Sequence, residues 1–285
     1  MKNKLIEKLN KIELVIFDLD GTLYEDTDHF DYYAECLAEQ LEPGKREEFW
    51  DDLQKSRTGG HPVKIGRVYD VEEDLILQIT IDGEVLNGWN WSGEKLSNHK
   101  LNELYPEKIS CNMYNKIYLG DGWWPPAAIA YHYGLESTEA CYLKTKEWIN
   151  NNDDFLQPTP GLRETLKNLK INKNIVLATN SDAQDTNSIL NNLDLQGVFQ
   201  DIYTSCNKPE NSFKLFNNII DEYDCSPEDI LSIGDNYLNE IGPVIKLGGE
   251  AILIDREDAF SQKDMSAYIV HSIKELIPIF NNAVE

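Results

Sequence analysis

The chain has 285 residues, enough for one large domain or two modest ones with a substantial buried core. Its formal net charge of −24 argues against binding to nucleic acids or to anionic membrane surfaces, because both need a basic footprint. The five cysteines are odd in number and unpaired in spacing, which indicates neither a disulfide framework nor a zinc site and suits a reducing compartment.

The first apolar run, residues 14–17, follows a short amphipathic helix pattern over residues 1–9. Neither segment is long enough for a signal peptide core or a membrane span, so we expect a cytoplasmic protein. The run ends abruptly at Asp18 and Asp20. We therefore predict a buried strand that delivers two carboxylates to the edge of a parallel sheet.

Residues 24–157 have a mixed pattern that differs from both ends of the chain. We predict a helix over 30–49, a hairpin or small sheet over 71–85 where apolar residues alternate, and one or two helices over 127–150. This segment is therefore expected to be a separate domain, mainly helical with some β-structure.

All the tryptophans of the chain lie in this middle segment. We prefer the interpretation that they build the core of a small domain, although the adjacent Trp123 and Trp124 are alternatively placed to stack on a base or sugar of a substrate. The six are Trp50, Trp89, Trp91, Trp123, Trp124 and Trp148.

The same segment contains a basic run without acids, made of Lys55, Arg57, His61, Lys64 and Arg67. Such a run is usually a solvated loop. Our hypothesis is that it binds or guides an anionic part of the substrate, with Arg57 as the substrate-binding residue. Reversing the charge of Arg57 and Arg67 should then raise KM for an anionic ester.

After residue 158 apolar strands alternate with helical patterns. We predict helices over 162–169, 189–193, 208–223 and up to 246, and strands over 175–178, 202–204, 230–233 and 251–254. This alternation demands right-handed crossovers and predicts an α/β fold with a doubly wound parallel sheet.

Polar residues follow the ends of these strands, where ligands bind in such sheets. The candidates are Asp18, Asp20, Thr179, Lys208 and Asp235. Carboxylates as close as Asp18 and Asp20 repel each other unless a cation or a shared proton offsets them. A divalent ion with hard oxygen ligands fits this need, and Asp235 and Glu240 add further acid.

Four segments, in their order and spacing, resemble the motifs of the haloacid dehalogenase-like (HAD) hydrolase superfamily. They are Asp18-Leu19-Asp20-Gly21-Thr22, Thr179-Asn180, Lys208-Pro209 and Gly234-Asp235 followed by Glu240. The resemblance implies a Rossmann-like catalytic core formed by residues 1–23 and 158–285. It also implies that residues 24–157 are a cap domain at the position called C1, while the segment 182–207 is too short for a second cap.

The resemblance makes Asp18 the nucleophile that takes the phosphoryl group and Asp20 the general acid and base. Thr179, Asn180 and Lys208 would bind the phosphoryl group, and Thr179 and Lys208 would also serve catalysis. The implied cofactor is Mg²⁺, and its implied ligands are Asp18, the main-chain carbonyl of Asp20, Asp235 and Glu240. The family usually has aspartate at the position of Glu240. The longer glutamate side chain either reaches the metal through a water molecule or caps the following helix.

A phosphoryl group in transfer is strongly anionic, so attack by a carboxylate needs a metal and a cation. Dehalogenases and ion-pumping ATPases of the superfamily generally lack the acid found here at Asp20. We therefore expect Mg²⁺-dependent hydrolysis of a small phosphorylated metabolite, a phosphate monoester, through an aspartyl-phosphate on Asp18. The alternatives are a phosphomutase of the same superfamily and a binding or regulatory protein that keeps the fold. Nothing in the sequence marks an interface between subunits.

Overall fold

The computed structural model describes residues 2–25, 27–112, 114–152, 156–256, 258–260 and 266–284. It divides into two compact units: unit 1 comprises Met1–Asp26 with Asn152–Glu285, and unit 2 comprises Thr27–Asn151. Unit 2 is thus one continuous segment inserted into the chain of unit 1. It begins slightly later and ends slightly earlier than the expected insert 24–157.

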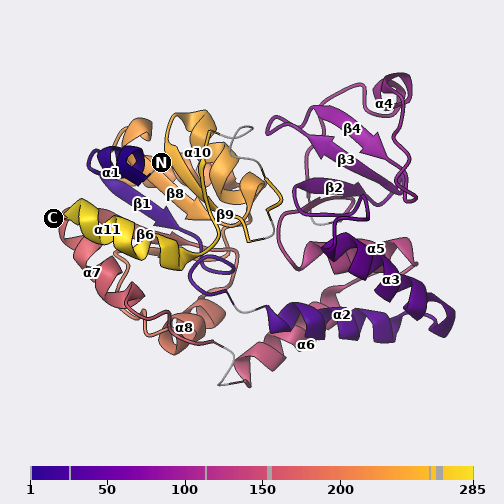
Figure 1. Cartoon of the computed structure of the whole chain (residues 1–285), viewed down its shortest axis with the longest axis horizontal. Helices are drawn as coiled ribbons and strands as arrows, with labels where there is room; N and C mark the ends of the chain where they lie inside the picture. Colours follow the sequence, from indigo (N-terminus) through magenta and orange to yellow (C-terminus); the bar gives the residue numbers. More distant parts are fainter. Residues whose placement is uncertain are drawn as a thin grey trace. The chain divides into compact units, whose positions relative to one another are not determined.

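Unit 1 is built on a six-stranded parallel sheet with the order β10-β9-β8-β1-β6-β7 (Figure 1). This confirms the predicted doubly wound sheet, and its order reverses beside β1. The edge strand β10 was not predicted, because a three-residue strand depends on pairing with its neighbour more than on its own pattern. The strands are β1 (Leu14–Phe17), β6 (Asn174–Ala178), β7 (Ile202–Tyr203), β8 (Ile230–Gly234), β9 (Glu250–Ile254) and β10 (Tyr268–Val270).

Helices cover both faces of this sheet, and successive side chains of β1 pack against opposite layers. The Phe17 ring meets Phe280 of α11 at 6.3 Å between centroids, whereas Ile16 belongs to a cluster with Phe216 of α9 and Val244 of α10. Burial on both faces explains why β1 is an uninterrupted apolar run. The helices are α1 (Lys2–Leu9), α7 (Leu162–Asn172), α8 (Ala183–Asn192), α9 (Ser212–Glu222), α10 (Gly242–Leu247) and α11 (Ile277–Val284).

Unit 2 combines helices with a four-stranded antiparallel sheet of order β4-β3-β2-β5. The single helix predicted over 30–49 is wrong: α2 ends at Gln40 and α3 begins at Arg46, because Pro43 and Gly44 form a short turn that cannot continue the first helix. The elements are α2 (Asp28–Gln40), α3 (Arg46–Arg57), β2 (Arg67–Asp70), β3 (Leu75–Ile79), β4 (Val85–Trp89), α4 (Asn98–Leu104), β5 (Lys116–Leu119), α5 (Trp124–His132) and α6 (Glu139–Asn150).

The tryptophans of unit 2 pack mainly against other rings of the same unit. Trp91 stacks on His132 at 3.6 Å between centroids and donates through its indole N–H to Asp52. Trp148 stacks on Tyr32 at 5.1 Å. Of the six, only Trp50 is exposed, at 38%. These contacts favour the interpretation that the tryptophans build the core of a small domain.

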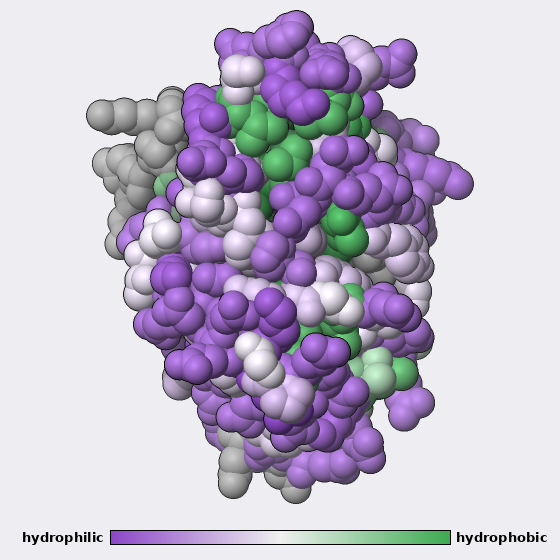
Figure 2. Space-filling model, turned by 90° about the vertical axis from the view of Figure 1, so that its right-hand side faces the viewer, coloured by the Kyte–Doolittle hydropathy of each residue, from purple (hydrophilic) through white to green (hydrophobic). Residues whose placement is uncertain are grey.

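The surface is predominantly polar, as the net charge leads one to expect. Figure 2 shows one face, on which hydrophilic residues predominate and hydrophobic residues gather in small groups. In the described ranges, no helix has both the length and the apolar character needed to cross a membrane.

Candidate active site

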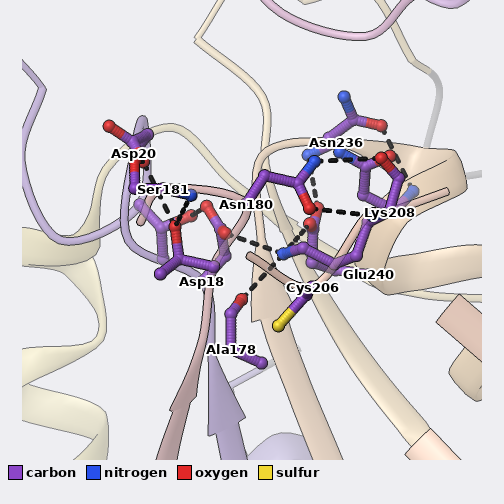
Figure 3. Close-up of polar contacts among 12 residues, drawn as sticks. Asp18, Asp20, Ala178, Asn180, Ser181, Cys206, Lys208, Asn236 and Glu240 are labelled. Atoms are coloured by element: carbon purple, nitrogen blue, oxygen red, sulfur yellow. Dashed lines mark hydrogen bonds and ion pairs between the residues drawn. The ribbon is translucent and has the colours of Figure 1, made fainter. Parts of the chain in front are cut away.

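The predicted site residues of unit 1 meet at the carboxyl edge of its sheet (Figure 3). Asp18 directly follows β1, Thr179 follows β6 and Asp235 follows β8. The main-chain N–H of Asp18 donates to the carbonyl of Ile233 in β8 at 2.9 Å, which ties two of these strand ends together. The parallel ladders around β1 therefore bring segments that lie far apart in the sequence to one place.

Lys208 lies at the centre of this place and joins two carboxylates. Its Nζ donates to Asp18 Oδ1 at 2.8 Å, to Glu240 Oε1 at 2.6 Å and to the main-chain oxygen of Ala178 at 2.8 Å (Figure 3). The Lys208 side chain is 1% exposed, and those of Asp18 and Glu240 are 8% and 4% exposed. One cation is therefore shared by two carboxyl groups in a nearly dry environment, and its charge can offset only one of them.

Burial and charge act in opposite directions on these three groups. Burial raises the pKa of the Asp18 carboxyl and that of Glu240 above their usual ranges, although the Lys208 ammonium opposes both shifts. Burial alone would lower the pKa of Lys208, but the two carboxylates outweigh it and raise that pKa. Lys208 therefore stays cationic, with its ammonium directed at Asp18, Glu240 and the Ala178 carbonyl.

Asn180 holds the loop that carries Lys208. Its amide nitrogen donates to the main-chain oxygen of Lys208 at 2.9 Å, and the main-chain N–H of Lys208 donates to its amide oxygen at 2.8 Å. These two bonds keep Lys208 out of the helix that was predicted to start there, so α9 begins only at Ser212. We expected Asn180 to bind substrate, but its side chain is engaged with this loop instead.

The Asp20 carboxylate accepts hydrogen bonds from three hydroxyls. Tyr24 donates to Oδ1 at 2.6 Å, Ser181 donates to Oδ2 at 2.9 Å, and Thr179 donates to Oδ2 at a longer 3.3 Å. The Thr179 hydroxyl also accepts from the main-chain N–H of Ser181 at 3.0 Å. Sequence reasoning identified Thr179, but it assigned no role to Tyr24 or Ser181.

The donors present fit a hard divalent cation. Gly21 has φ +76°, and a Cβ at this position would lie 2.0 Å from Asp235 Oδ2, so the Asp235 carboxylate lies directly against the Asp20–Gly21 segment. Asp18 and Asp235 would offer carboxylate oxygens and Asp20 its main-chain oxygen, all of which suit Mg²⁺. Among the described residues, no three His, Cys, Asp or Glu side chains form a metal-binding group, whereas this donor set needs only two carboxylates.

Glu240 differs from its expected metal role. Its Oε1 binds Lys208, and its Oε2 accepts from the main-chain N–H of Asn236 at 3.2 Å. Asn236 is the N-cap of the π-helical segment Tyr237–Ile241, in which Glu240 itself lies, so this bond closes the first turn of that segment. The helix that follows, α10, has Ile241 as its N-cap without a side-chain cap bond, so Glu240 does not cap it, and its metal role stays a prediction. Gly234 leaves room for the longer side chain, because a Cβ there would lie 2.6 Å from Glu240 Cγ.

Replacing Gly21 by alanine should weaken both the fold and metal binding. The left-handed backbone would cost about 1–2 kcal/mol for any L-residue, and the new Cβ would also displace the Asp235 carboxylate. We expect Mg²⁺ affinity to fall roughly tenfold or more, as measured by calorimetric titration. Gly197→Ala is the matched control, because Gly197 has φ +70° and no atom within 4 Å of its added Cβ. Equal Mg²⁺ affinity in the two variants would contradict the placement of Asp235.

The basic run of unit 2 is not a free cationic patch. Arg57 pairs with Asp31, and Lys55 pairs with Asp51. The guanidinium of Arg67 lies 3.8 Å from the centroid of the Trp89 ring. Acids from outside the run thus pair with Arg57 and Lys55, whereas Arg67 packs on an aromatic ring. Substrate binding by Arg57 would require it to exchange Asp31 for the substrate, and it stays a prediction.

Solved structures with a similar fold are HAD-type proteins. The HAD-hydrolase YfnB from Bacillus subtilis, described as bound to magnesium, has a TM-score of 0.51 and 14% identity, covering 95% of this chain and 99% of that chain. A haloacid dehalogenase-like hydrolase from Xanthomonas campestris has a TM-score of 0.49 and 14% identity, with coverages of 96% and 92%. A dehalogenase has a TM-score of 0.48 and 16% identity, with coverages of 94% and 96%. At these identities the likeness concerns the fold alone.

The sequence itself matches a family model. No curated protein sequence matches this chain significantly. The model of the haloacid dehalogenase-like hydrolases, however, matches residues 12–242, which include the strand ends after β1, β6 and β8 and the loop of Lys208. Because the match covers most of the chain, the protein belongs to the haloacid dehalogenase-like hydrolase family.

Proposed function

We propose that this protein is a Mg²⁺-dependent phosphatase that hydrolyses a small phosphate monoester through an aspartyl-phosphate on Asp18. The observation that carries the proposal is that two carboxyl groups, Asp18 and Asp20, follow the same strand but have different hydrogen-bond partners. Lys208 holds Asp18 in a buried position suited to a nucleophile, whereas hydroxyl groups hold the half-exposed Asp20. One carboxylate is thus suited to covalent catalysis and the other to proton transfer.

The charge of the site supports the metal requirement. Asp18, Asp20, Asp235 and Glu240 bring four carboxyl groups to the site, where Lys208 pairs with two of them. A phosphate dianion approaching this group meets strong repulsion unless a further cation is present. Mg²⁺ would supply that charge and orient the phosphoryl oxygens.

The residues support a two-step reaction with one proton carrier. In the first step Asp20 must start in its protonated form: an Asp18 oxygen attacks phosphorus, the bond from phosphorus to the leaving oxygen breaks, and the Asp20 carboxyl group gives that oxygen its proton and becomes a carboxylate. In the second step Asp20 takes a proton from water, the water oxygen attacks phosphorus, and the bond from phosphorus to Asp18 breaks. Inorganic phosphate and an alcohol are the products, and Lys208 offsets the negative charge on the Asp18 side throughout.

The first experiment measures turnover of p-nitrophenyl phosphate with Mg²⁺, with chelator, and after Mg²⁺ is restored. We expect hydrolysis that chelator abolishes and that Mg²⁺ recovers, because the carboxylates alone repel the substrate. Transfer of the phosphoryl group to a sugar phosphate in preference to water would favour a phosphomutase. A metal-loaded protein without turnover on this ester or on a panel of phosphorylated metabolites would contradict the proposal and favour a binding protein.

A further inference from the structure

Tyr24 stands next to Asp20 because of the turn that follows β1. The main-chain N–H groups of Thr22 and Leu23 donate to the carbonyl of Leu19, so the chain makes one tight turn there. Residues four apart on such a turn lie on the same side. The Tyr24 hydroxyl therefore reaches the Asp20 carboxylate within the same segment of unit 1.

The contact between Tyr24 and Asp20 is a strong hydrogen bond with a fixed direction. Its length of 2.6 Å lies in the range of an O–H donating to a carboxylate. Tyr24 is only 3% exposed, so few solvent molecules can compete for its hydroxyl. Tyr24 thus acts as a hydrogen-bond donor to Asp20 Oδ1.

Ser181 holds the other oxygen of the same carboxylate. Its hydroxyl donates to Asp20 Oδ2 at 2.9 Å from the loop after β6, whereas Tyr24 donates to Oδ1 from the loop after β1. Because hydrogen bonds from two different loops hold both oxygens of the Asp20 carboxylate, this group cannot rotate freely, even though Asp20 is half-exposed. Proton transfer needs such a fixed orientation, because the donor must lie within hydrogen-bond reach of the reacting oxygen.

We propose that Tyr24, together with Ser181, is a positioning residue that orients the Asp20 carboxylate for proton transfer to the leaving group. The inference rests on the proposed phosphatase function and adds to it a residue that acts through Asp20. It predicts a particular kinetic signature, because only a poor leaving group needs a proton as it departs. Nitrophenolate is stable without one, whereas phenolate is less stable.

The experiment compares Tyr24→Phe with wild type on p-nitrophenyl phosphate and phenyl phosphate. We expect kcat/KM to fall by about 10- to 100-fold for phenyl phosphate and by less than about threefold for p-nitrophenyl phosphate, with KM changed little. Tyr203→Phe is the matched control, since its hydroxyl donates to Glu222 at 2.7 Å, and it should show no dependence on the leaving group. An equal loss on both esters, or no loss, would overturn the role of Tyr24.

If the melting curve of Tyr24→Phe shows that this variant is poorly folded, Ser181→Ala provides an independent test. It removes the shorter of the two hydroxyl hydrogen bonds to the other Asp20 oxygen, so a selective loss on phenyl phosphate is again expected, and a uniform loss would overturn the inference. If the proposed phosphatase function is wrong, the kinetic measurements give a different result. Wild type would then turn over neither ester, or its turnover would survive Asp18→Asn, and both proposals would fall together.

Discussion

Asp18→Asn is expected to lower phosphatase activity by roughly 10⁴-fold or more, which corresponds to about 5.4 kcal/mol of transition-state stabilisation. The amide cannot form the acyl-phosphate that the two-step reaction requires. It also removes the negative charge that faces Lys208 at 2.8 Å. The measurement is kcat/KM on p-nitrophenyl phosphate with saturating Mg²⁺, together with acid-quenched mass spectrometry of the intact protein during turnover.

The mass spectrum should show one phosphoryl group on the wild-type protein and none on the Asp18→Asn variant. Asp221→Asn is the control, because Asp221 is an exposed carboxylate on α9 of the same unit, and its activity and phosphoryl adduct should match wild type. A phosphoryl adduct that persists in the Asp18→Asn variant would place the nucleophile elsewhere.

Lys208→Met should damage both the reaction and the fold. Removing the cation leaves Asp18 and Glu240 buried without their partner, and an uncompensated buried charge typically costs about 3–5 kcal/mol. Losing a preorganised charge beside the nucleophile should lower kcat by about 10²- to 10³-fold. Urea unfolding of the metal-free protein and kinetics with Mg²⁺ measure the two losses separately.

The stability loss in Lys208→Met should grow with pH. Burial already raises the pKa values of Asp18 and Glu240, and without the ammonium those pKa values rise further. The native state then keeps protons that the unfolded state has lost, so the free energy of unfolding decreases as pH rises from about 5 to 8. Adding Glu240→Gln should restore part of the stability at pH 8 but no activity. A variant as stable as wild type at pH 8 would contradict the buried charge pairing.

The sequence was most informative about the sheet and the groups at its strand ends. Runs such as 14–17 and 230–233 are apolar throughout because both faces of their strands are buried, and this pattern marks a parallel sheet clearly. The rule that ligands bind at the carboxyl edge then placed Asp18, Thr179 and Asp235 near one another. The position of Lys208 depended on the family motif, since it lies in a loop and not at the end of an apolar run.

The remaining features depend on loop paths and side-chain direction, which periodicity does not record. Tyr24 reaches Asp20 only because the chain turns tightly after β1, and Glu240 turns toward Lys208 only because Gly234 leaves space for it. In unit 2 the break between α2 and α3 could have been predicted from Pro43 and Gly44. The partner of Arg57 could not, because Asp31 lies far from it in the sequence, whereas the pair of Lys55 with Asp51 follows from their spacing on one helix.

The two hydrogen bonds between the Asn180 side chain and the main chain of Lys208 hold that main chain independently of the ammonium group. The loop can therefore keep its path when the side chain is shortened, while the oxygens of Asp18, Ala178 and Glu240 still surround the vacated position. In a shortened variant these three oxygens would face one another without a cation between them. The loss of activity would then report the missing charge and not a displaced loop.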